Sequence, residues 1–228
     1  MIGFYSYTVI LTYLSLAVSM IGITQVVEGH FRTAILCLAL SGLLDMFDGK
    51  VARTKKNRTD DEKLFGIQID SLCDMVCFGA FPALFCYYLG VRGLLGVTAV
   101  SYYCICSVIR LAFFNVLETR RQSVEGGANK FYHGLPITSM AIILPISYLL
   151  NFAVDESVFR WILFALLFVV GTFFVVDIKL KKPSNKFLII LVLVVAAAVI
   201  VILTISDTYH VALPRFIERS LFHMFWDK

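Results

Sequence analysis

The chain has 228 residues, of which 59% are hydrophobic and 16% are charged, and its formal net charge is +4. A mean hydropathy of +0.84 is too high for an ordinary soluble globular domain. The small net charge, without a basic patch interleaved with aromatic residues, gives no reason to expect nucleic-acid binding. We therefore expect an integral membrane protein.

Seven apolar stretches are long enough to cross a membrane as helices, and they lack the short alternating pattern of barrel strands. They cover about residues 4–23, 31–50, 65–88, 94–116, 135–153, 158–176 and 187–205. No interdomain linker and no internal repeat separates them. The sequence thus predicts a single all-α, polytopic membrane helix bundle.

Lysine and arginine in the connections predict the orientation, because basic residues are held on the cytoplasmic side during insertion. They follow the second, fourth and sixth spans: Arg53, Lys55, Lys56, Arg58, Lys63, Arg120, Arg121, Lys130, Lys179, Lys181, Lys182 and Lys186. The alternate connections contain only Arg92. The connection after the second span is therefore predicted to face the cytoplasm. The tail after about residue 206 is expected outside, or flat on the membrane as an amphipathic helix.

The second span carries two aspartates on one helical face. Asp45 and Asp48 are three residues apart, and the small residues Gly49 and Ala52 continue the same face. This face is predicted to leave room for a ligand beside the two carboxylates.

The third span repeats the arrangement, with Gly66, Asp70 and Asp74 spaced every four residues. Acidic side chains inside membrane spans are costly, and they usually mark an ion site, a proton path or a catalytic centre. Grouped carboxylates repel one another unless a cation lies between them, and all-oxygen ligands suit Mg²⁺ or Mn²⁺. Two such faces together predict a cluster of four carboxylates around a divalent cation.

Two other interpretations remain open. In a salt-bridged helix pair, Lys50 and Arg53 would neutralise some of the acids. A metal-ion or proton transporter would also place acids in its spans, but it would need charged or polar groups deeper in these two spans. The acids of the loop that precedes the third span, Asp60 to Glu62, are expected to belong to a helix start, because Thr59 and Glu62 have the spacing of a capping box.

The two aspartate stretches together form a longer pattern. "DMFDGKVAR" followed by "GIQIDSLCD" resembles the signature of the CDP-alcohol phosphotransferases, D-x-x-D-G-x-x-A-R and then G-x-x-x-D-x-x-x-D. The chain has all eight fixed residues of this signature: Asp45, Asp48, Gly49, Ala52, Arg53, Gly66, Asp70 and Asp74. The resemblance implies a six-helix membrane domain over residues 1–186, with an additional helix and tail over 187–228.

This resemblance also implies a reaction in which a CDP-linked lipid transfers its phosphatidyl group to an alcohol and releases CMP. It implies that Asp45, Asp48 and Asp70 are ligands of Mg²⁺ or Mn²⁺. Asp74 is implied as the base that takes the hydroxyl proton, and it is also counted among the metal-site carboxylates. Arg53 would bind a diphosphate oxygen, and the small residues Gly49, Ala52 and Gly66 would let the nucleotide approach. The family is further expected to form homodimers.

Three further stretches resemble the phosphatidylserine synthase branch of that family. These are "DSLCDMVCFGAFPA", "IRLAFFNV" and "FYHGLPIT", with Phe113 where the branch has Arg and Thr138 where it has Pro. They imply CDP-diacylglycerol as donor and L-serine as acceptor, with Arg110 as a substrate-binding residue. Snorkelling of Arg110 to the membrane edge is the alternative. Inositol phosphate or glycerol phosphate also remains open as the acceptor.

Overall fold

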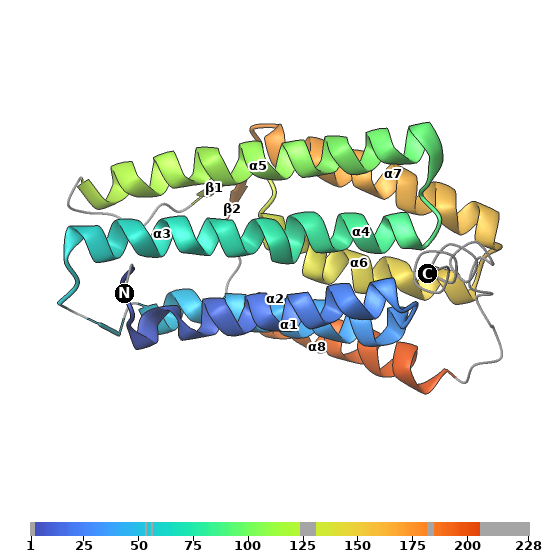
Figure 1. Cartoon of the computed structure of the whole chain (residues 1–228), viewed down its shortest axis with the longest axis horizontal. Helices are drawn as coiled ribbons and strands as arrows, with labels where there is room; N and C mark the ends of the chain where they lie inside the picture. The colour runs from blue at the N-terminus through green and yellow to red at the C-terminus, as the bar shows by residue number, and fades with distance from the viewer. Residues whose placement is uncertain (1–2, 53, 56, 124–130, 182–184, 206–228) are drawn as a thin grey trace, which may run out of the picture.

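A computed structural model of the chain forms an elongated bundle of roughly parallel and antiparallel helices (Figure 1). The structure describes residues 3–52, 54–55, 57–123, 131–181 and 185–205. Its helices are η1 (Tyr7–Val9), α1 (Ile10–Val27), α2 (Phe31–Ala52), α3 (Asp60–Asp74), the π-helix η2 (Met75–Ala80), α4 (Phe81–Tyr88), α5 (Gly93–Ser123), η3 (Ile137–Ser139), α6 (Met140–Tyr148), η4 (Leu149–Phe152), α7 (Glu156–Val175) and α8 (Asn185–Thr204). The segments α3, η2 and α4 are continuous, as are η3, α6 and η4.

The predicted all-α, polytopic bundle is confirmed. Four helical segments of the described chain are long and apolar enough to span a membrane: Tyr7–Val27, Asp60–Tyr88, Gly93–Arg120 and Glu156–Val175. The apolar segments Ile137–Phe152 and Leu188–Thr204 are shorter. The remaining predicted span, α2, is a continuous helix, but its apolar sequence contains the charged residues Arg32, Asp45, Asp48 and Lys50.

Two three-residue strands were not predicted. β1 (Phe131–His133) and β2 (Lys179–Lys181) pair antiparallel, with Tyr132 opposite Leu180. They join the connection that precedes α6 to the connection that follows α7. A pairing this short depends on contacts between distant parts of the chain, which local sequence patterns do not reveal.

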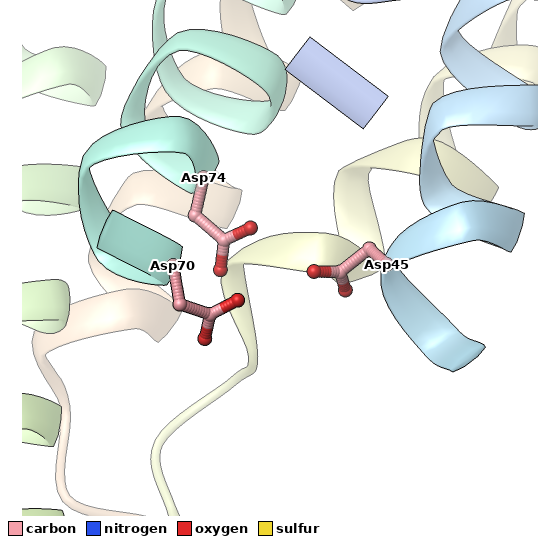
Figure 2. A group of neighbouring side chains, drawn as sticks. All are labelled: Asp45, Asp70 and Asp74. Atoms are coloured by element: carbon pink, nitrogen blue, oxygen red, sulfur yellow. The ribbon is translucent and has the colours of Figure 1, made fainter. Parts of the chain in front are cut away.

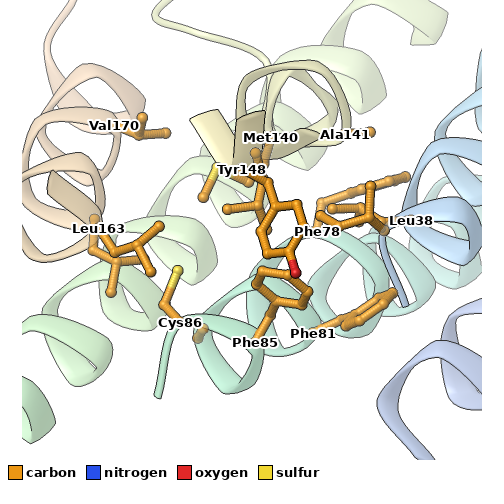
Figure 3. Close-up of a cluster of buried hydrophobic side chains, with 14 of the residues drawn as sticks. Leu38, Phe78, Phe81, Phe85, Cys86, Met140, Ala141, Tyr148, Leu163 and Val170 are labelled. Carbon is orange, nitrogen blue, oxygen red and sulfur yellow. The ribbon is translucent and has the colours of Figure 1, made fainter. Parts of the chain in front are cut away.

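The central rod α3–η2–α4 lies between the α1–α2 pair and the α5–α7 pair (Figure 1). Its inner face carries Phe78, Phe81 and Phe85, none of which is exposed (Figure 3). The Phe85 ring meets the ring of Tyr148 on α6 edge to face, with the centroids 5.7 Å apart. These aromatic side chains form the apolar centre against which the outer helices pack.

The third predicted span, about 65–88, belongs to a longer helix that begins at Asp60, the start that the spacing of Thr59 and Glu62 predicts. The predicted capping box is confirmed: Thr59 accepts from the backbone N–H of Glu62, and the Glu62 side chain accepts from that of Thr59. Asp60, Asp61 and Glu62 occupy the first turn, where carboxylates complement the helix dipole. This cap fixes where α3 starts.

The π-helix in the middle of the rod was also not predicted. Its wider turn is marked by the bond from the Phe81 backbone N–H to the Val76 carbonyl, five residues earlier. Pro82 has no N–H to donate to the Phe78 carbonyl in the usual helical bond. Instead, the hydroxyl of buried Tyr103, on α5, donates to the Phe78 oxygen at 2.6 Å.

Replacing Tyr103→Phe should therefore lower the free energy of unfolding in detergent by about 1–3 kcal/mol, because a buried carbonyl loses its donor. The matched control is Tyr102→Phe, whose hydroxyl bonds Thr172 Oγ1 at 3.0 Å in an exposed setting. Denaturant titration of both variants measures the difference. Equal losses would mean that the Phe78 carbonyl does not depend on Tyr103.

Candidate functional site

Three carboxyl groups converge between α2 and α3. Asp70 and Asp74 on α3 point toward Asp45 on α2, and Asp45 points back toward them (Figure 2). One oxygen from each side chain lies within 4.8 Å of the others. All three residues are half-buried. The two aspartate faces predicted from the sequence therefore face each other.

Local structure explains the position of the two α3 acids. Asp70 and Asp74 are one helical turn apart, so their side chains lie on the same face. The π-helix starts at the next residue, Met75, so the phase of the rod changes immediately after the second acid. The acids thus share one face, and the aromatic residues beyond them follow a shifted register.

Asp48 lies beside this group rather than within it. It is 9% exposed, and its Oδ2 accepts a hydrogen bond from Thr12 Oγ1 on α1 at 3.1 Å. Its carboxyl group also lies within hydrogen-bonding reach of Asp70. The four predicted carboxylates are therefore neighbours, and Asp48 links their cluster to α1.

No ion pair among the described residues joins a basic side chain to these four acids. Lys55 pairs with Glu62 at 2.9 Å, and Lys63 pairs with Asp60 at 2.8 Å. The ammonium of Lys50 lies 5.1 Å from the centre of the Phe47 ring. The described residues thus offer no support for a salt-bridged helix pair.

The donor set fits a hard divalent cation. Converging carboxylates without basic partners repel one another in a low-dielectric setting. An all-oxygen set suits Mg²⁺ or Mn²⁺, each of which commonly binds one or two carboxylates together with substrate phosphates. Asp45, Asp70 and Asp74 could supply such ligands, with Asp48 adjacent.

The small residues of the signature lie around the same region. A Cβ atom added to Gly49 would meet no other atom within 4 Å, so the helix surface is open there. One added to Gly66 would lie 2.6 Å from the Arg58 guanidinium, which is the movable end of a long side chain. Ala52 is half-buried at the end of α2. Arg53 lies outside the described residues.

Arg110 does not snorkel, because only 6% of the residue is exposed. Its Nε donates to the Leu135 carbonyl at 3.0 Å, and its guanidinium carbon lies 5.9 Å from the centre of the Phe114 ring. The snorkelling alternative is therefore wrong. Arg110 holds the Gly134–Pro136 turn that leads into η3.

Gly134 requires its glycine, because its φ of +73° is left-handed and a Cβ would lie 3.0 Å from the Phe174 carbonyl. Its N–H donates to the Ile178 carbonyl, and the N–H of Leu135 donates to that of Phe173, both at 2.9 Å. The turn is thus fixed to the end of α7. The side chain of His133 is not among those described.

Residues 7–175 match the model of the CDP-alcohol phosphatidyltransferases, a range that includes both aspartate faces and ends before α8. The chain belongs to this family.

Several curated relatives are similar over part of their length. The CDP-diacylglycerol–serine O-phosphatidyltransferase of Saccharomyces cerevisiae is 33% identical over 134 residues, 58% of this chain and 47% of that protein. The archaetidylserine synthase of Methanothermobacter thermautotrophicus is 33% identical over 132 residues, 58% of this chain and 52% of that protein. The serine phosphatidyltransferase of Methanocaldococcus jannaschii is 32% identical over 151 residues, 66% of this chain and 64% of that protein. The alignments thus span about half to two thirds of these relatives.

If the carboxylate cluster binds a cation, Mn²⁺ should raise the thermal unfolding temperature of the protein in detergent. A ligand at a hundred times its dissociation constant stabilises a protein by about 2.7 kcal/mol. Asp45→Asn should remove this increase, because it takes a charged ligand from the cluster. The measurement is thermal unfolding with and without Mn²⁺.

Asp61→Asn is the matched control, because Asp61 is an exposed acid in the first turn of α3. It should keep the full Mn²⁺ effect. Loss of the effect in Asp61→Asn, with retention in Asp45→Asn, would place the cation at the start of α3 instead.

Proposed function

We propose that this protein is a metal-dependent CDP-diacylglycerol–serine O-phosphatidyltransferase, which makes phosphatidylserine and CMP. The observation that carries the proposal is the convergence of Asp45, Asp70 and Asp74 between α2 and α3. The names of the three relatives described above, two serine phosphatidyltransferases and one archaetidylserine synthase, support serine as the acceptor.

Asp45, Asp48 and Asp70 are the proposed ligands of Mg²⁺ or Mn²⁺, and Asp74 borders the same site. The ion, when bound, would neutralise negative charge on the diphosphate and on the departing CMP. The open helix surface at Gly49, with Ala52 and Gly66 nearby, is the proposed approach for the nucleotide. Arg53 is proposed to donate to a diphosphate oxygen, for which a forked guanidinium is well suited.

The proposed reaction is one phosphoryl transfer. The hydroxyl oxygen of serine forms a bond to the lipid-bearing phosphorus, and the bond from that phosphorus to the oxygen of CMP breaks. Asp74 accepts the hydroxyl proton on a carboxylate oxygen as the attack proceeds. A positioned general base contributes roughly 10²–10⁴-fold to the rate of such a step.

Arg110 and the turn that it holds are proposed to border the serine site. The Arg110 side chain is buried rather than directed to the membrane edge, and its Nε donates to the carbonyl of Leu135, in the turn before η3. An acceptor that carries a phosphate group would need additional cations. Arg120, Arg121 and Lys130 are the sequence candidates for that alternative.

The basic connections after α2, α5 and α7 support a cytoplasmic site in a multi-pass protein of the cell membrane. We further propose a homodimer, and a division into a catalytic domain at 1–186 and an additional helix with a tail at 187–228. The family match over residues 7–175 is compatible with this division.

A competition assay tests the acceptor. Purified protein receives CDP-diacylglycerol, Mn²⁺ and equal concentrations of serine, inositol phosphate and glycerol phosphate, and the lipid products are identified by mass spectrometry. Phosphatidylserine should be the main product and should require the metal. A phosphatidyl product of either phosphorylated acceptor would replace serine in the proposal.

The variant Asp74→Asn separates the base from the ligands. It keeps the size and a coordinating oxygen but loses basicity, so CDP-diacylglycerol should still bind in a metal-dependent way. Serine-dependent release of CMP should fall by roughly 10²–10⁴-fold. Both quantities are measured on the same preparation.

Asp45→Asn provides the contrast, because loss of a proposed ligand should weaken lipid binding and turnover together. If Asp74→Asn also loses both, Asp74 acts as a ligand rather than a base. Turnover within a few-fold of the wild type would place the base elsewhere.

A further inference from the structure

A buried chain of hydroxyl groups joins α1, α2 and the π-helix. Ser19 Oγ donates to Ser41 Oγ at 2.8 Å, and Ser41 Oγ lies 2.7 Å from Ser15 Oγ. Ser15 Oγ in turn lies 3.1 Å from the Ser41 carbonyl and 3.7 Å from Cys77 Sγ, both as acceptors. The exposed fractions of these four residues are between 0% and 3%. Each hydroxyl can therefore donate one hydrogen and leave none without a partner.

This network lies next to the carboxylates along each of its three elements. Ser41 precedes Asp45 by one turn of α2. Cys77 lies in the π-helix, three residues after Asp74, the last residue of α3. On α1, Ser15 lies one turn after Thr12, whose hydroxyl donates to Asp48. The hydroxyl chain thus connects the elements that carry or contact the acids.

Close packing alone does not require these hydroxyls. Small residues already let membrane helices approach closely, as at Gly22, where a Cβ would lie 2.4 Å from Phe81 Cζ. Alanine would fill the same space at the serine positions. Hydrogen bonds add direction, because they fix the rotation of each helix about its own axis.

The carboxylates supply a force that such bonds can oppose. Asp45 and Asp74 belong to different helices and repel each other when both are charged and no cation is bound. A single interhelical hydrogen bond in a membrane protein is weak. Several such hydrogen bonds beside the carboxylate cluster can set the separation and rotation of the helices there. They are too weak to hold the whole bundle together.

We propose that Ser15, Ser19 and Ser41 are positioning residues, whose hydroxyl network holds α1, α2 and η2 so that Asp45 and Asp74 converge at cation-binding distance. The inference rests on the metal site of the proposed function. It assigns to α1, which has no acidic or basic residue within its helix, a part in building that site.

The test is the affinity for Mn²⁺ alone, measured in detergent from the electron paramagnetic resonance signal of free Mn²⁺. Ser41→Ala removes the serine that bonds both others. It should raise the Mn²⁺ dissociation constant roughly 3–10-fold, the range expected for losing one or two weak interhelical hydrogen bonds. Adding Ser19→Ala to this variant should change little more, because the acceptor of Ser19 is already gone.

Ser107→Ala is the matched control. Ser107 is equally buried, but its hydroxyl donates to the Tyr103 carbonyl of its own helix at 2.8 Å. This variant should lose a similar amount of thermal stability and keep the wild-type Mn²⁺ affinity. An equal effect of Ser107→Ala and Ser41→Ala on affinity, or no effect of Ser41→Ala, would overturn the inference.

If Ser41→Ala does not fold, Ser19→Ala decides the question by the same titration. It should weaken Mn²⁺ binding, and unchanged affinity would overturn the proposal. A wild-type protein that does not bind Mn²⁺ overturns both this inference and the proposed metal dependence. A protein that binds Mn²⁺ with the expected variant effects, but transfers nothing to serine, supports this inference and overturns only the proposed acceptor.

Discussion

Mutual repulsion of carboxylates in an apolar bundle is the constraint on which the arrangement of this protein depends. Asp45 on α2 and the acids Asp70 and Asp74 on α3 have oxygens within 4.8 Å of one another, and no basic side chain of the described chain pairs with them. A cation that compensates this charge, and helices that hold the acids together, both stabilise such a group. The site and its scaffold are therefore parts of one physical problem.

The scaffold meets this constraint with polar bonds at particular places in an otherwise apolar bundle. The capping box at Thr59 sets the start of α3, and the bond from Tyr103 to the Phe78 carbonyl supports the wider π-helical turn. Arg110 anchors the turn before η3 through the Leu135 carbonyl. Each bond thus fixes the position of one element of the bundle.

The sequence predicted the parts that local spacing determines. Helical periodicity placed Asp70 and Asp74 on one face, and the Thr59 and Glu62 spacing predicted the cap. It did not predict the π-helix, because that turn depends on Pro82 together with the hydroxyl of Tyr103, which comes from another helix. The bond from Thr12 to Asp48 and the burial of Arg110 likewise depend on tertiary packing. The roles of the individual acids stay predictions.

The most direct test of the central claim is to locate the cation itself. Crystals of the protein grown with Mn²⁺ and CDP-diacylglycerol, measured at the manganese absorption edge, would show its position as an anomalous peak. We expect the peak among the carboxylates of Asp45, Asp48, Asp70 and Asp74, next to the diphosphate of the lipid. A peak at the acids that begin α3, or a bound nucleotide lipid with no peak among these carboxylates, would contradict the account.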